Sequence, residues 1–114
     1  MRAIITNLKR ASVEIIILTL LNEEPMYGYQ IAQEIKKRSE GKFSLMEASM
    51  YPVLNRLTDQ GDVTLEVVQK TPKSKRVYYH ITETGKTHLI EMKQIYLDNV
   101  NIINSLIKNT ETKY

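Results

Sequence analysis

The residues best suited to contact another molecule lie between positions 44 and 57, where apolar residues recur at helical spacing. At about 100° per residue these apolar side chains share one side of a helix, as a core requires. The opposite side and its flanks lack the Lys and Glu of a solvated face. They carry small residues, Tyr, Pro, Asn and Arg, namely Ala48, Ser49, Tyr51, Pro52, Asn55 and Arg56. Small residues allow close approach and Asn and Arg commonly contact base edges, so this helix is predicted to recognise DNA.

A second group of candidate residues is basic and follows a few residues later. Four cations lie within residues 70–76, and no acidic residue lies among them. They are Lys70, Lys73, Lys75 and Arg76. Alternating apolar residues over 63–67 and 77–81 predict a β-hairpin with these cations at its tip. One interpretation is a loop that uses charge to stay soluble. We favour a basic wing that contacts a phosphate backbone, because the hairpin directly follows a pair of helices.

The elements that must position these residues are predicted to be three helices, the hairpin and a fourth helix. Helical apolar spacing covers 6–21 and 27–38, and Gly41 supplies a left-handed stop after the second helix. Ser44 and Glu47 have the spacing of a capping box that would start the third helix, which is predicted to end at Gly61. A proline beyond the first turn disturbs a helix, so Pro52 predicts a later start or a local distortion.

The last predicted helix follows Thr82, a suitable N-cap, and is too long for a small domain. Its apolar residues alternate spacings of three and four, and we expect them to pack against a second copy of the chain. They are Leu89, Met92, Tyr96, Val100, Ile103, Leu106 and Ile107. The predicted fold is therefore mainly α with a small β-hairpin. It consists of a winged helix-turn-helix over 1–82 and a dimerisation helix with a tail over 83–114.

Length and composition fit one small domain that binds a polyanion. The chain has 114 residues, a formal net charge of +3 and a pI of about 9.1. It has no Cys, which excludes disulfides and Cys-based zinc sites. The apolar run 15–21 is too short to span a membrane and has no small-residue cleavage site after it. We therefore expect a cytoplasmic protein.

Enzymatic chemistry finds little support in the sequence. We identify no nucleophile–base arrangement, glycine-rich phosphate loop or plausible carboxylate pair, so neither catalysis nor a cofactor is expected. His80 and His88 lack the spacing of a metal site and are expected to be ordinary surface or strand residues. Tyr27, Tyr29 and Tyr79 are expected to lie in the core.

The motifs, taken in order, resemble those of the PadR family of bacterial transcriptional regulators. The matching segments are 27–31 (YGYQI), 48–57 (ASMYPVLNRL), Gly61 and 76–85 (RVYYHITETG). The resemblance implies a dimeric repressor that binds a palindromic operator, with Tyr51 and Pro52 facing the DNA. The single terminal helix is similar to that of the short subfamily, which includes multidrug-sensing regulators of lactic bacteria.

The resemblance also implies a small aromatic or cationic ligand, which binds between the subunits and releases the DNA. Members of that branch typically carry a Trp on the terminal helix, whereas this chain has no Trp and has Tyr96 at the corresponding place. The candidate ligand-binding residues are Ile15, Leu18, Met92, Tyr96 and Val100. Two alternatives remain open: a dimer core that is simply filled, and a winged helix that docks a protein partner without specific DNA binding.

Overall fold

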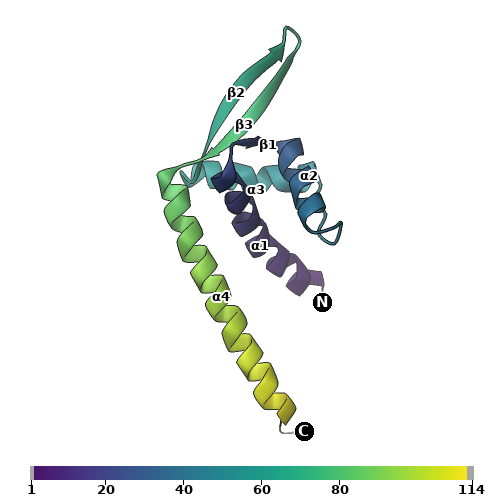
Figure 1. Ribbon diagram of the computed structural model, residues 1–114, viewed down its shortest axis with the longest axis vertical. Coiled ribbons are helices and arrows are strands. Elements are labelled where there is room, and N and C mark those ends of the chain that lie inside the picture. The colour runs from purple at the N-terminus through teal and green to yellow at the C-terminus, as the bar shows by residue number, and fades with distance from the viewer. Residues whose placement is uncertain (1, 113–114) are drawn as a thin grey trace.

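The computed structural model describes the backbone of residues 2–112 and the side chains of residues 12–109. Three helices gather at the base of a β-hairpin, which projects to one side while the last helix runs in the other direction (Figure 1). The elements are α1 (Arg2–Glu23), β1 (Met26–Tyr27), α2 (Gly28–Arg38), α3 (Glu47–Asp59), β2 (Val63–Thr71), β3 (Ser74–Ile81) and α4 (Glu83–Thr112). This arrangement confirms the predicted fold class.

One strand was not predicted from the sequence. The two residues of β1 pair antiparallel with β3, which gives a three-stranded sheet in the order β1-β3-β2. Met26 lies opposite Tyr79 and both side chains are buried, so this short strand ties the connection between α1 and α2 to the sheet. A strand of two residues is too short to show a periodic pattern in the sequence.

The core lies where α1, α2 and α3 meet the base of the sheet. Its fully buried members include Ile17 and Leu18 from α1, Ile31 from α2, and Leu54 and Leu57 from α3. Burying one such side chain stabilises the fold by about 1.5–3 kcal/mol. This packing therefore fixes the orientation of α3, the helix predicted to recognise DNA.

The third helix begins two residues later than the capping box predicted. Its N-cap is Met46, which makes no side-chain cap hydrogen bond, so the prediction for Ser44 and Glu47 is wrong. The reason lies in the preceding turn, where Phe43 and Leu45 pack partly buried against the core. Both backbone groups of Phe43 also bond to the Ser39 hydroxyl, at 2.9 and 3.0 Å. Anchoring these residues keeps the chain extended until position 46.

The hairpin of β2 and β3, here called the wing, has longer strands than predicted. Its turn contains only Pro72 and Lys73, so Lys70, Lys75 and Arg76 lie within strands and not in a loop. The wing also extends beyond the helices that would cover it. Val63 at its base is buried, whereas Leu65 is 53% and Val67 is 61% exposed on the same face. The apolar alternation was therefore a sign of strand structure but not of burial.

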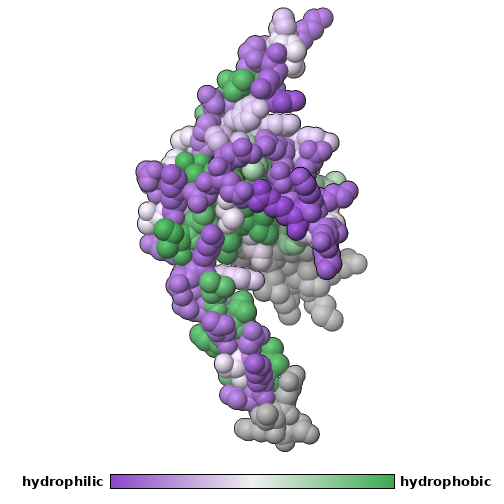
Figure 2. Space-filling model, in the orientation of Figure 1, coloured by the Kyte–Doolittle hydropathy of each residue, from purple (hydrophilic) through white to green (hydrophobic). Residues whose placement is uncertain are grey.

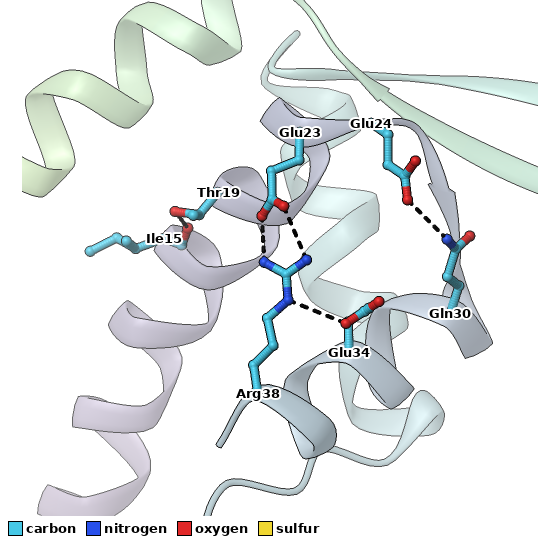
Figure 3. Close-up of polar contacts among 7 residues, drawn as sticks. All are labelled: Ile15, Thr19, Glu23, Glu24, Gln30, Glu34 and Arg38. Carbon is cyan, nitrogen blue, oxygen red and sulfur yellow. Dashed lines mark hydrogen bonds and ion pairs between the residues drawn. The ribbon is translucent and has the colours of Figure 1, made fainter. Parts of the chain in front are cut away.

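Figure 3 shows a polar clamp that joins the end of α1 to α2. The Arg38 guanidinium donates to both carboxylate oxygens of Glu23, at 2.5 and 3.0 Å, and to Glu34 at 3.2 Å. These hydrogen bonds hold the pKa of the Glu23 carboxyl below its ordinary value of 4.5. The clamp lies on the surface, so it orients two helices that the core already holds together.

The fourth helix leaves the core after two turns. Thr82 is its N-cap as predicted, because the Thr82 hydroxyl accepts a hydrogen bond of 3.0 Å from the Gly85 amide. Leu89 is buried against the core, but most side chains after it are exposed. Apolar residues remain visible along this projecting part of α4 (Figure 2). At about 1.5 Å per residue, the 30 residues of α4 reach about 45 Å.

Three expectations about single residues need correction. Tyr29 is exposed and Tyr27 is only partly buried, so only Tyr79 of the three tyrosines lies in the core. His88 is not an ordinary surface residue, because its ring contacts the buried carboxylate of Asp62.

Within the described part of the chain, no helix is long and apolar enough to cross a membrane.

Candidate nucleic-acid interface

The outer face of α3 carries the predicted recognition residues. Those on the exposed side are Ala48, Ser49, Tyr51, Pro52 and Asn55. The side chains that alternate with them, among them Met50 and Leu54, are buried. Burial on one side thus leaves a face of small and polar side chains directed away from the core.

Pro52 lies inside α3, at the sixth residue of the helix. A proline has no amide proton, so the usual helix hydrogen bond to the Ala48 carbonyl cannot form. Ala48 itself is exposed, so Pro52 leaves this carbonyl without its usual helix partner in an exposed turn of α3.

Tyr51 connects α3 to the start of α2. Its hydroxyl donates to the Glu47 carboxylate at 3.2 Å, and partial burial followed by this carboxylate raises the pKa of the Tyr51 hydroxyl. A Cβ atom at Gly28 would lie only 2.8 Å from the Tyr51 hydroxyl oxygen. The tyrosine thus lies directly against the backbone of α2, and a side chain at position 28 would make its hydroxyl shift.

The charged group of Arg56 is engaged with another helix, α1. Its Nε and Nη2 atoms donate to one oxygen of Glu14 in α1, at 2.9 and 2.6 Å. This ion pair is partly buried and joins positions that are far apart in the sequence, so helical spacing gave no sign of it. A contact between Arg56 and DNA would require this ion pair to open.

Two cations of the wing, Lys70 and Arg76, lie against aromatic rings on the face of the sheet away from the core. The Lys70 ammonium lies 5.4 Å from the centre of the Tyr78 ring, and the Arg76 guanidinium lies 4.4 Å from that of Tyr27. The two rings meet edge to face at 5.5 Å. The Arg76 guanidinium, with a smaller effect of Lys70, holds the pKa of the Tyr78 hydroxyl below its ordinary value. Strand alternation predicts that Arg76 and Tyr78 share a face, but the contact with Tyr27 depends on the unpredicted β1.

A groove of about 260 Å³ separates the wing from the start of α3. Its walls include Glu47 and Tyr51 from α3, and Lys75 and Val77 from β3. Of the predicted DNA-binding residues, Tyr51 from α3 and Lys75 and Arg76 from the wing line this groove. Glu47 is the one acidic side chain among the described residues that line it, so the groove and the basic wing beside it suit a polyanion.

The predicted ligand-binding residues fall into two environments. Leu18 is fully buried in the core of the single chain, so it does not line a surface that a second subunit would cover. Ile15, Met92 and Val100 are partly buried and Tyr96 is exposed. A larger hollow of about 610 Å³ lies elsewhere, along α2, and contains none of these residues.

The described residues offer no grouping of three or more His, Cys, Asp or Glu side chains that could hold a metal ion. The chemistry of the surface is therefore that of hydrogen bonds and charge. An exposed third helix, a supporting second helix and a basic hairpin define a winged helix-turn-helix protein.

Comparison with known proteins agrees with this class. The model of the transcriptional regulator PadR-like family matches residues 17–91, and the chain belongs to this family. A protein from Lysinibacillus sphaericus is 33% identical over 102 residues, which cover 90% of this chain and 94% of that protein. The negative transcriptional regulator PadR of Bacillus subtilis is 32% identical over 73 residues, which cover 64% of this chain and 40% of the regulator.

Solved structures are similar over most of the chain. A transcriptional regulator from Clostridium thermocellum superposes with a TM-score of 0.81 and 27% identity, covering 87% of this chain and 93% of that one. Bacillus subtilis PadR in complex with operator DNA superposes with a TM-score of 0.65 and 29% identity, covering 70% of this chain and 46% of that one. The similarity to the short Clostridium protein extends over nearly its whole length, whereas PadR has a further part that this chain does not match.

Proposed function

We propose that this protein is a sequence-specific DNA-binding regulator, and more narrowly a repressor, that acts as a homodimer in the cytoplasm. The observation that carries the proposal is a groove that has Tyr51 of α3 on one side and Lys75 and Arg76 of the wing on the other. The related PadR of Bacillus subtilis, a negative transcriptional regulator, has been solved with operator DNA, which supports the same assignment.

In the proposed complex the N-terminal half of α3 enters the major groove. Ala48 and Ser49 are small enough for close approach, and Asn55 is suited to contact a base edge. Lys73 and Lys75 of the wing contact the phosphate backbone, which contributes affinity but no sequence information. Arg56 remains with Glu14 and supports the helix from behind.

The proposal includes a dimer because of the exposed apolar side of α4. Ile103, Leu106 and Ile107 are at least half exposed although they repeat at helical spacing. Covering them with the same helix of a second copy would present two recognition helices, which fits a palindromic operator with half-sites about 34–36 Å apart. The division into a DNA-binding part over 1–82 and a dimerisation helix over 83–114 belongs to the same proposal.

A test of the proposal starts from DNA sequences selected from a random pool by the purified protein. We expect a strong preference for the selected sequence over random DNA, measured by fluorescence anisotropy. Asn55→Ala should weaken binding to the selected sequence about 5- to 150-fold, the equivalent of about 1–3 kcal/mol. Asn99→Ala on α4 is the matched control and should bind like the parent. Equal affinity for selected and random DNA would support the alternative, a protein-interaction module.

Ligand release remains a separate prediction. Quenching of Tyr96 fluorescence by planar cationic compounds, compared with a Tyr96→Ala variant, tests it. A saturable signal that disappears in the variant would support a ligand at the dimer interface, and no saturable signal would favour a filled dimer core.

A further inference from the structure

The corner where α3, the wing and α4 meet contains a buried carboxylate that the proposed DNA surface does not use. Asp62 is 1% exposed and is the only buried polar or charged residue among the described side chains. Its Oδ1 atom lies 2.6 Å from Nδ1 of His88, in the second turn of α4. A carboxylate accepts hydrogen bonds, so the imidazole Nδ1–H is the donor. The other oxygen, Oδ2, has no hydrogen-bond partner in the described part of the chain.

Backbone contacts at the same corner hold the beginning of α4. The Thr82 amide donates to the Asp62 carbonyl at 3.0 Å, and the Thr82 hydroxyl donates to the Gly61 carbonyl at 2.7 Å. A Cβ atom at Gly85 would come within 2.2 Å of the Asp62 carbonyl oxygen. The first turn of α4 therefore lies directly on the residues that end α3 and begin the wing.

We propose that His88 and Asp62 are positioning residues that fix the angle between α4 and the recognition helix α3. Apolar contacts of Leu89 and Met92 hold α4 against the core. The contacts of Thr82 attach its first turn through hydrogen bonds. His88 is six residues further on, about 9 Å along the axis, and supplies a second point of attachment. Two points of hydrogen bonding, at Thr82 and His88, fix the direction of the α4 axis. The apolar contact of Leu89 adds stability, but apolar burial is non-directional.

The energetics favour this assignment over a simple stabilising contact. A tilt of α4 away from the corner would leave the Asp62 carboxylate buried without a donor, and such an orphaned charge is strongly unfavourable. The angle matters because α4 reaches about 45 Å. In the proposed dimer a small change at the corner would alter the separation of the two copies of α3. This consequence rests on the proposed function, whereas the positioning role itself concerns one chain.

The positioning role can be measured without DNA. The chain has no Cys, so Ala48→Cys in α3 and Asn99→Cys in α4 can be spin-labelled selectively. Labelled protein is diluted with unlabelled protein so that pulsed electron paramagnetic resonance reports the distance within one chain. We expect one narrow distribution of the distance between the two labels in the parent protein, and a clearly broader one in His88→Ala and His88→Leu.

Two matched variants separate positioning from general stability. His88→Asn places an amide donor near the position of Nδ1 and should restore the narrow distribution. His80→Ala removes a histidine that hydrogen-bonds with Glu66 at 2.9 Å on the wing and not with Asp62, so it should leave the distribution unchanged. If His88→Ala is too unstable to study, His88→Leu retains the bulk of the side chain and is compared at a temperature where it is folded. The positioning role would be overturned if His88→Ala and His88→Leu gave distributions as narrow as that of the parent. It would also be overturned if His88→Asn gave a distribution as broad as that of His88→Ala.

A second arm tests the consequence for DNA. The selected DNA is altered by inserting one or two base pairs between its half-sites. The parent should lose affinity with each insertion, whereas His88→Ala should discriminate less between the spacings. Broad distance distributions in a protein whose parent selects no specific DNA would leave the positioning role in place and reject the proposed function. Narrow distributions in the His88 variants, together with specific DNA binding by the parent, would reject the positioning role and leave the proposed function in place.

Discussion

Two surfaces of this small protein are exposed, and they differ in chemistry. The outer face of α3 and the wing carry small, polar and cationic side chains, whereas the projecting part of α4 carries Ile102, Ile103 and Leu106. Figure 2 shows hydrophilic side chains over the wing and apolar ones along α4. A polar surface can remain exposed to water when no ligand is bound. An apolar stripe of this length is less favourable in water, and this difference supports proposing a partner helix for α4 and a DNA-binding face for α3.

The largest expected effect comes from placing a charge in the apolar stripe. Ile103→Asp should weaken the dimer roughly 100- to 10,000-fold, because each of two copies loses about 1.5–3 kcal/mol of apolar burial. Sedimentation across a concentration series measures this. Asn104→Asp introduces the same charge one residue away, on a position that is already polar, and should change the dimer little. A parent protein that remains monomeric at all concentrations would contradict the proposal that the apolar stripe of α4 forms a dimer.

The next effect tests whether the polar surface binds phosphates. Lys73→Ala combined with Lys75→Ala should lower the slope of log affinity against log salt by about 0.9 for each phosphate that the wing no longer neutralises. The control combines Lys86→Ala and Lys93→Ala, which remove the same charge from α4. An unchanged slope in the wing variant, or an equal change in the control, would exclude the wing from the interface.

A smaller effect concerns the support of the recognition helix. Gly28→Ala should destabilise the protein by at most about 1 kcal/mol, because the new methyl group would overlap the Tyr51 hydroxyl and this half-exposed side chain would have to shift. Tyr51→Phe removes that oxygen, so the double variant should recover part of the stability. Urea unfolding of the four proteins in this cycle gives the coupling. Independent effects of the two substitutions would mean that Tyr51 does not lie against α2.

The smallest effect is that of the surface clamp between α1 and α2. The Arg38 guanidinium lowers the pKa of Glu23 below 4.5 in the folded protein, so the clamp stabilises the fold above that pH and loses its effect as the pH falls through the lowered value. The difference in stability between the parent and Glu23→Gln should therefore be constant near neutral pH and shrink in acid. Glu24→Gln is the control, because Glu24 accepts from the uncharged Gln30 side chain. A difference that persists unchanged at about pH 3 would argue against the clamp.

Periodic patterns predicted the parts of the fold that repeat. The apolar spacing of α3, the N-cap at Thr82 and the alternation of the wing were sufficient for the fold class and for the exposed face of the recognition helix. The sequence did not predict contacts between distant positions. The pair of Arg56 with Glu14 and the contact of His88 with Asp62 join elements whose relative placement depends on packing. The start of α3 was missed because Phe43 and Leu45 are anchored by the core and not by a local capping pattern.

The exposed wing has one further consequence, for solubility. Outside the short pairing with β1, both strands of the wing have an unpaired edge, and Leu65 and Val67 add apolar side chains to it. Such edges invite pairing with another chain, and lysines beside them are a common protection. Lys70, Lys75 and Arg76 lie on these strands, so they give the free protein the charge that discourages such pairing. The cations proposed to contact DNA would thus also keep the protein from aggregating when no DNA is bound.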